Sequence, residues 1–248
     1  QWQRFRRMLT SDVNAAIEGF FAGGADEVLV NDAHSTMRNI LLEDLDPRAS
    51  MLTGRHKPLG MMEGVQDAGA AAFVGYHAGA GEPGVLAHTY LGAGLLGLWI
   101  NGAPASEGRL NALVAASLGV PVVLVTGDDQ TCADAAKYAP AAETVPVKTS
   151  VSRYAASCRH PSVTAAEIQA AANRAAGSAG RGQAMAGPWH FEIEFHATQM
   201  ADAATQIPDV ELVTPRRVGF SFDDMLVAAR CFRACTHLAG AATEPDFD

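Results

Sequence analysis

A chain of 248 residues with 48% hydrophobic and 18% charged residues can bury a substantial core, as one large domain or as a main domain with a smaller appendage. Its net charge of -9 and pI near 5.3 argue against a nucleic-acid or anionic-membrane surface, because a polyanion would be repelled over most of the molecule. No apolar run reaches the roughly 18 residues needed to cross a bilayer, so we expect a cytoplasmic protein without nucleic-acid or membrane partners.

An amphipathic helix opens the chain. Apolar side chains recur at helical spacing, among them Phe5, Val13 and Ile17, and predict a helix near residues 3–22. The helix leads directly into the apolar run "EVLVND", and the chain starts at Gln1 without a methionine. In an α/β protein a strand normally precedes such a helix, so we expect an N-terminal strand that lies outside this sequence.

Short β-rich runs alternate with helical patterns through the first 150 residues. The predicted strands are Glu27–Asp32, Ala72–Tyr76, Leu98–Asn101 and Val120–Thr126, and further helices lie near 105–118 and 129–138. Alternation of this kind indicates an α/β fold with a mostly parallel, doubly wound sheet and helices on both faces. The runs "EVLV", "AAFVGY" and "PVVLVT" are almost continuously apolar, as expected for strands covered on both faces.

The remainder of the chain has a different pattern. A capping box of Thr164 and Glu167 opens a predicted helix, and "WHFEIEF" alternates like a half-buried antiparallel strand. A further strand pair around "VELVTPRRVGFSF" and a closing helix from Asp223 follow. We therefore expect an α/β domain over 1–150 and a smaller α+β C-terminal part over 151–248.

Four cysteines, Cys132, Cys158, Cys231 and Cys235, are scattered along the chain without a CxxC pair. This usage is typical of a reduced protein in the cytoplasm. Cys231 and Cys235 are four residues apart in "AARCFRACTHL", which favours two small apolar side chains on a buried helix face.

Polar side chains follow three of the predicted strands, at the edge where open parallel sheets bind ligands. In chain order they are Asn31, Asp32 and His34, then His77, then Asp128 and Asp129. Two histidines at equivalent strand ends, with His88 eleven residues after the second, favour a metal site. Imidazole nitrogens from separate strands must converge, because they surround one ion within about 2.0–2.2 Å. An isolated histidine in such a place is more often only exposed or hydrogen-bonded.

The acidic candidates have simpler structural explanations. Glu107 lies at the start of a predicted helix, where a carboxylate complements the helix dipole, although it can equally point into the same crevice. Asp128 and Asp129 precede another helix and are most simply its N-cap residues.

The segment "GAGEPG" at 79–84 matches the GxGxxG pattern of dinucleotide-binding loops. Pro83 lies where a helix should open, and apolar "LGLWIN" replaces the acidic residue expected about 20 positions later. A second match, "GAGLLG" at 92–97, shows how readily this chain generates the pattern. A nicotinamide-dependent enzyme is therefore a minor alternative, and we predict no cofactor-binding glycines.

Several ordered segments resemble one protein family. They are "EVLVNDAHSTMRN", "GYHAGAGEPGVLAHTY", "INGAPASEGRLNALVAASLGVPVVLVTGDD" and "VKTSVSRYAA". Together they are similar to the DppA-type D-aminopeptidases, a family of dinuclear zinc metallopeptidases. The ordered set of motifs is much more specific than any single one of them.

The resemblance implies a cytoplasmic hydrolase that removes N-terminal residues, notably D-amino acids, from short peptides. It also implies two zinc ions per subunit and self-association into ring-like homo-oligomers, decamers in the type member. Matched motif by motif, His34, His77 and Glu107 correspond to metal ligands, and His88 corresponds to a histidine with a catalytic role. The domain over 1–150 would then carry both the metal and the active site.

One departure from the family pattern leaves two explanations open. The family's remaining ligands, an aspartate and a glutamate, lie in a DxEG motif on a strand near the N-terminus, and this sequence contains no such motif. Either the motif precedes Gln1 in a full enzyme, or the protein lacks half of the metal shell. In the second case it would be a non-catalytic oligomeric binding protein on the same scaffold.

Overall fold

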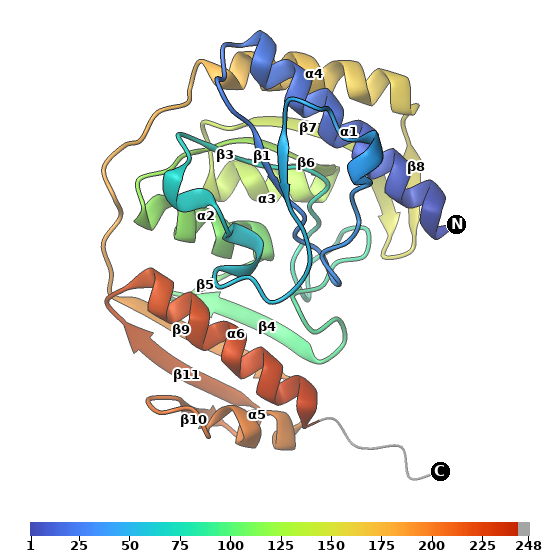
Figure 1. Ribbon diagram of the computed structural model, residues 1–248. Coiled ribbons are helices and arrows are strands. Elements are labelled where there is room, and N and C mark those ends of the chain that lie inside the picture. The colour runs from blue at the N-terminus through green and yellow to red at the C-terminus, as the bar shows by residue number, and fades with distance from the viewer. Residues whose placement is uncertain (243–248) are drawn as a thin grey trace.

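A computed structural model of the protein describes residues 1–242 and packs a parallel sheet, an antiparallel sheet and their covering helices together (Figure 1). The helices are α1 (Trp2–Ala22), α2 (Glu107–Ser117), α3 (Asp129–Tyr138), α4 (Pro161–Ala176), α5 (Thr198–Ala204) and α6 (Met225–Ala241). The strands are β1 (Leu29–Asn31), β2 (Ser50–Leu52), β3 (Ala71–Phe73), β4 (Leu95–Ile100), β5 (Ala103–Pro104), β6 (Val122–Asp128), β7 (Glu143–Ser152), β8 (Ala155–Cys158), β9 (Trp189–Phe195), β10 (Glu211–Thr214) and β11 (Arg217–Phe222). Short 3-10 helices lie at Leu42–Asp44, Gly60–Met62 and Val65–Asp67.

The first layer is a mainly parallel sheet with helices on both faces. Its strand order is β3-β6-β7-β8, in which β3, β6 and β7 run parallel and β8 returns antiparallel to β7. Helices α1 and α4 lie side by side over one face, where Ala16, Leu124 and Ile168 share a buried cluster. Helices α2 and α3 cover the other face, where Leu110 and Val125 belong to the main core. The predicted α/β fold with a parallel, doubly wound sheet is confirmed.

Strand β1 pairs with β2 in a separate two-stranded parallel sheet. Helix α1 packs against this pair through Val13 and Ile17, which join Ile40 and Leu45 in a small buried cluster. The pair fixes the start of the segment that follows β1, and that segment carries His34.

The second layer is an antiparallel sheet in the order β10-β11-β9-β4-β5, packed by α5 and α6. Strand β9 alternates between buried and more exposed residues as "WHFEIEF" predicts, and β10 and β11 are the predicted strand pair. The predicted strand Leu98–Asn101 belongs here as β4, antiparallel to β9, and its placement in the parallel sheet is wrong. The physical reason is a hairpin: Asn101 and Gly102 both have positive φ, the Asn-Gly signature of a tight turn, and return the chain directly into β5.

The start of α4 also differs from the prediction. The helix begins at Pro161 with His160 as N-cap, so the capping box of Thr164 and Glu167 does not open it. Proline is favoured at the first helical position because its fixed φ suits the helix and its missing N–H would be unsatisfied there anyway. Thr164 instead donates to the Pro161 carbonyl, and Glu167 forms an ion pair with Arg159.

The closing helix α6 begins at Met225, two residues after the predicted start at Asp223, because Asp224 is its N-cap and accepts from the Leu226 amide at 2.7 Å. Cys231 and Cys235 lie on its buried face, as predicted. None of the helices in residues 1–242 combines the length and the apolar character that a membrane crossing requires.

Candidate metal centre

Three histidines from two separate parts of the chain converge at one end of the parallel strands. His34 follows β1, and His77 and His88 bracket the loop that follows β3. One ring nitrogen of each lies within 4.8 Å of the corresponding nitrogen of the others. The rings of His77 and His88 are stacked with centroids 4.1 Å apart, and the His34 ring stands edge-on to both. The predicted histidines therefore come together, although no sequence pattern fixes their mutual distance.

Hydrogen bonds to backbone carbonyls determine how two of these rings present their nitrogens. His77 Nδ1 lies 3.0 Å from the Ala78 carbonyl oxygen, and His88 Nδ1 lies 2.7 Å from that of Leu86. A carbonyl oxygen only accepts, so each Nδ1 carries a hydrogen and each neutral ring keeps its lone pair on Nε2. Metal-binding histidines commonly donate their second nitrogen to a carbonyl or carboxylate in this way.

The carboxylate of Glu107 completes the group of donors. Glu107 is the first residue of α2 and is only 5% exposed, and its Oε2 lies 3.7 Å from His77 Nε2. Its Oε1 accepts from the Tyr90 amide at 2.8 Å, which fixes the orientation of the carboxylate. Ser106 caps α2 by accepting from the Arg109 amide, so the helix start is held independently of Glu107. Glu107 thus points into the crevice as well as complementing the helix dipole.

The loop that carries His34 is clamped by the buried side chains of Asp32 and Asn39. Asp32 Oδ2 accepts from the backbone amides of Asn39 and Ile40, and its Oδ1 accepts from Asn39 Nδ2 at 2.7 Å. Asn39 Nδ2 also donates to the His34 carbonyl at 2.7 Å. Asp32 and Asn39 are 3% and 1% exposed, so these bonds form away from solvent. Asn39 was missed by sequence reasoning, because nothing in "STMRN" marks its side chain as the partner of Asp32.

The glycines between His77 and His88 allow close backbone packing. A Cβ on Gly79 would lie 3.0 Å from Ser106 Cα, and a Cβ on Gly84, where φ is 143°, would lie 2.7 Å from Ala78 Cβ. No helix follows "GAGEPG" until α2 begins at Glu107, so the dinucleotide-loop interpretation is wrong. Gly79 instead lets the loop pass close to Ser106 at the start of α2, and Gly84 lets it pass close to Ala78 at its own beginning.

The two aspartates after β6 have different roles. Asp128 is the N-cap of α3, as predicted: its Oδ1 accepts from the Thr131 amide at 2.8 Å. Its Oδ2 also accepts from the Val85 amide at 2.6 Å, which ties the glycine-rich loop to α3. Asp129 is not an N-cap, because it lies inside the helix and accepts from the Ser150 amide at 2.7 Å.

The surroundings of His34 favour its neutral ring. Burial lowers the pKa of His34. The carboxylate of Glu107 opposes this shift, whereas the neighbouring rings of His77 and His88 lower the pKa of His34 further. Burial also raises the pKa of Tyr90, so its phenol stays neutral beside Glu107. A neutral imidazole is the form that binds a metal ion.

The donor set fits a zinc ion. Bonds of about 2.0 Å in a tetrahedral zinc site separate neighbouring ligand atoms by about 3.3 Å, close to the distance between His77 Nε2 and Glu107 Oε2. His34, His77 and His88 offer imidazole nitrogens, and Glu107 offers a carboxylate oxygen. Nitrogen and oxygen ligands of this kind are those of catalytic zinc sites.

The fold and the donor set first define a class: an α/β protein with a candidate histidine–carboxylate metal site of the kind that metallohydrolases use. Residues 1–234 then match the family Peptidase_M55, D-aminopeptidase, and the chain belongs to this family. The chain is 35% identical to the D-aminopeptidase of Bacillus subtilis (strain 168) over 242 residues, which cover 96% of this chain and 88% of the relative.

A solved structure gives the same result. It is described as the Zn-dependent D-aminopeptidase DppA from Bacillus subtilis, a self-compartmentalizing protease. The two folds agree with a TM-score of 0.90 and 34% sequence identity, over 100% of this chain and 90% of the other. The predicted family and the predicted enzyme class, a hydrolase, are confirmed, and the comparisons give the non-catalytic alternative no support.

Proposed function

We propose that this protein is a zinc-dependent aminopeptidase that removes N-terminal D-amino acids from short peptides. One observation carries the proposal: ring nitrogens of three histidines come together, and the buried carboxylate of Glu107 lies beside that of His77, in a chain of the D-aminopeptidase family. The zinc dependence of the structural relative supports the choice of metal.

In this proposal His34, His77 and Glu107 hold the metal. A zinc ion in such a site supplies Lewis acidity, which activates water for attack and polarises the scissile carbonyl group. Asp32 and Asn39 keep the His34 loop in place through their buried hydrogen bonds. A second ion would need further donors, such as the aspartate and glutamate of the DxEG motif, which residues 1–248 do not contain.

His88 is assigned the proton transfer. Its Nδ1 is engaged by the Leu86 carbonyl, so Nε2 is the nitrogen that is available to take up a proton during attack and return it to the leaving amine. The ring lies against that of His77 with centroids 4.1 Å apart, which places it beside the metal ligands. An imidazole suits this role because it titrates near neutral pH.

The experiment measures zinc content and peptide hydrolysis on the full chain. We expect hydrolysis of D-aminoacyl dipeptides in preference to their L counterparts, loss of activity on chelation, and recovery with zinc. His34→Ala and His77→Ala should each lose zinc and more than about a hundredfold in kcat/KM. His88→Ala should retain zinc and lose kcat. His196→Ala, an exposed histidine outside the cluster, is the matched control and should retain both properties. Full activity in a metal-free sample would refute the proposal.

We also infer that the protein assembles with copies of itself, as a ring-like homo-oligomer with a decamer as the expected size. The self-compartmentalizing character of the structural relative supports this. Exposed apolar side chains, among them Trp2, Val151 and Tyr154, offer contact surface, with Tyr154 80% exposed. The four cysteines are free, which supports a reducing, cytoplasmic location. Native mass spectrometry tests the assembly: a monomer at micromolar concentration would refute it.

A further inference from the structure

Asp128 joins the start of α3 to the segment of the glycine-rich loop that leads to His88. Its Oδ1 caps α3 by accepting from the Thr131 amide at 2.8 Å and from the Thr131 hydroxyl at 2.6 Å. Its Oδ2 accepts from the Val85 amide at 2.6 Å. Asp128 is only 1% exposed, so these bonds form away from solvent. A helix cap needs only one acceptor oxygen, so the second oxygen of Asp128 serves the loop.

The turn between β7 and β8 holds the same loop segment from the other side. The Leu86 amide donates to the Arg153 carbonyl at 2.8 Å. The end of β7 is itself attached to α3, because Asp129 accepts from the Ser150 amide at 2.7 Å. The two consecutive aspartates at the start of α3 therefore support both the loop and the turn that binds it.

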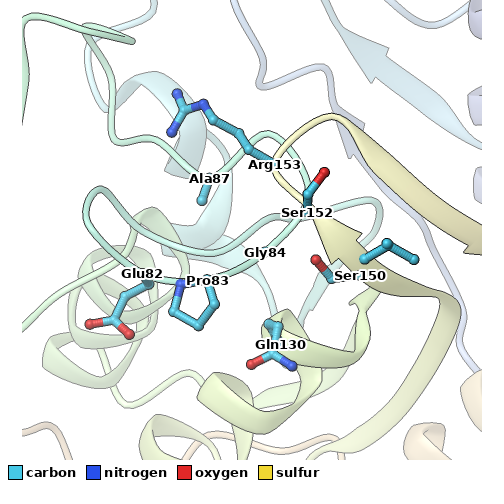
Figure 2. Close-up of a pocket in the computed structure, with 9 residues that line it drawn as sticks. Glu82, Pro83, Gly84, Ala87, Gln130, Ser150, Ser152 and Arg153 are labelled. Carbon is cyan, nitrogen blue, oxygen red and sulfur yellow. The ribbon is translucent and has the colours of Figure 1, made fainter.

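Figure 2 shows the loop with Gly84 and Ala87 between this turn and the start of α3, where Gln130 lies. A cavity of about 250 Å³ separates part of the loop from the turn, and Ala87 and Arg153 are among the residues that line it. Side chains do not fill this space, so packing alone does not fix the loop here. The hydrogen bonds to Asp128 and Arg153 therefore matter for where the loop lies.

Leu86 has a backbone conformation that leucine rarely adopts. Its φ is 56°, in the left-handed region, and the residue is 55% exposed. This conformation costs free energy because it brings the Cβ atom close to the following carbonyl oxygen. Burial of the side chain offsets little of that cost, since more than half of the residue faces solvent. A conformation of this kind persists where the surrounding contacts determine it, and the bonds at Val85 and Leu86 are such contacts.

The left-handed turn directs the Leu86 carbonyl oxygen at the ring of His88. His88 Nδ1 lies 2.7 Å from that oxygen, and the His88 amide donates to the Ala78 carbonyl at 3.2 Å. The bond at Nδ1 leaves Nε2 as the nitrogen with the lone pair. A series of contacts thus connects the carboxylate of Asp128 with the imidazole ring to which proton transfer is assigned.

We propose that Asp128 is a positioning residue for His88. Through the Val85 amide it holds the left-handed turn at Leu86, and this turn orients the imidazole ring. The inference rests on the proposed aminopeptidase function, in which His88 transfers the proton, and adds to that reaction a residue outside the metal-ligand set. It differs from a role as helix cap, because any residue with one suitable acceptor oxygen could replace Asp128 as a cap.

The substitution Asp128→Ser separates the two roles. Serine is as good an N-cap as aspartate, but it lacks the second oxygen that binds the Val85 amide. The variant should keep its zinc and lose about tenfold or more in kcat, with KM changed by less than about twofold, because only proton transfer is misaligned. Asp224→Ser is the matched control, since Asp224 caps α6 through one oxygen. It should keep both zinc and kcat. Urea unfolding identifies the conditions under which both variants are folded and can be compared.

Two substitutions of Leu86 test the turn while leaving Asp128 in place. Valine disfavours the left-handed conformation because it is branched at Cβ, whereas asparagine tolerates it. Leu86→Val should therefore lose kcat as Asp128→Ser does, and Leu86→Asn should recover most of that loss. A side chain that acted only by contact with substrate would give the opposite order, because valine keeps the apolar surface.

Crystal structures of the metal-free proteins separate this inference from the proposed function. In Asp128→Ser the Leu86 carbonyl should turn away from His88 Nδ1, and in Asp224→Ser it should stay in place. If the native chain hydrolyses no peptide, the proposed function is wrong, and these structures alone decide whether Asp128 positions His88. An intact bond between Leu86 and His88 in Asp128→Ser would overturn the inference. In an active enzyme, so would an unchanged kcat in Asp128→Ser, or equal kcat values in Leu86→Val and Leu86→Asn.

Discussion

The substitution Asp32→Asn tests how the His34 loop is held. In the native chain one carboxylate oxygen accepts from two backbone amides, those of Asn39 and Ile40, and the other accepts from Asn39 Nδ2. An amide in this place has one acceptor oxygen and one donor NH2 group. Whichever way it turns, the NH2 group meets a donor of Asn39 or Ile40.

The magnitude follows from these three bonds. In the better orientation the amide oxygen keeps the two backbone bonds, but both change from charged to neutral, which costs about 1 kcal/mol each. The bond from Asn39 Nδ2 is lost, at about 1–2 kcal/mol, because that group is buried and keeps only the His34 carbonyl as partner. We therefore expect the free energy of unfolding to fall by about 3 kcal/mol. Zinc affinity should fall by about tenfold or more, as for other residues that orient a metal ligand.

Urea unfolding at pH 7 measures the first quantity, and competition with a chelator of known affinity measures the second. Asp26→Asn is the matched control, since Asp26 is exposed between α1 and β1 and should change stability by less than about 0.5 kcal/mol. The reasoning would be refuted if Asp32→Asn unfolded like the control. It would also be refuted if the variant lost stability but held zinc as tightly as the native chain, because Asp32 would then not position His34.

Three further predictions concern other parts of the fold. Gly84→Ala should lower the free energy of unfolding by about 2–4 kcal/mol, because φ is 143° and the new Cβ would lie 2.7 Å from Ala78 Cβ. Gly92→Ala, where φ is 59° and the space is open, should lower it by only about 1 kcal/mol. Urea unfolding of both variants measures the difference. Burial raises the pKa of Asp12 to about 6, so its cost to folding is absent below pH 4, grows as pH rises towards 6 and is complete above it. Asp12→Asn should therefore raise the free energy of unfolding by about 2–3 kcal/mol at pH 7.5 and leave it unchanged at pH 3.5, as denaturant unfolding at the two pH values would show. Ser106→Ala removes the N-cap hydrogen bond of α2 and a 2.6 Å hydrogen bond to Asp134. It should lower the free energy of unfolding, measured by thermal denaturation, by about 1–2 kcal/mol.

Much of the α/β layer was predictable because its signals are local. The continuous apolar run of β6 is typical of a strand covered on both faces, and its residues Val123, Leu124 and Val125 are at most 3% exposed. Asp128 precedes a helical pattern and caps α3 as predicted. The position of His77 at the edge where β3 and β6 end was predictable, because topology brings the carboxyl ends of parallel strands together. His34 follows β1, which pairs with β2 in a separate sheet, so the shared edge does not explain its place in the cluster.

The errors came from short signals that compete with longer patterns. The alternation of strands and helices assigned Leu98–Asn101 to the parallel sheet, while the dipeptide Asn101–Gly102 was sufficient to indicate a hairpin. The capping-box pattern likewise placed the start of α4 at Thr164, whereas the helix begins three residues earlier, at Pro161. The partnership of Asp32 with Asn39 could not be predicted, because two polar residues seven apart in a loop have no fixed geometry.

The loop from His77 to His88 shows why glycine is required where no dinucleotide binds. Its two ends carry histidines whose Nδ1 groups bond to carbonyls of the same loop, so the chain must turn sharply next to each ring. Its middle must also pass close to Ser106 on one side and Ala78 on the other, where a side chain would collide. A loop with both constraints orients its two histidines through hydrogen bonds to its own carbonyl groups. A cavity that Arg153 also borders lies along this loop. The glycine pattern that resembles a phosphate-binding loop is thus explained by close packing, because Gly79 and Gly84 lie where a side chain would collide with Ser106 and Ala78.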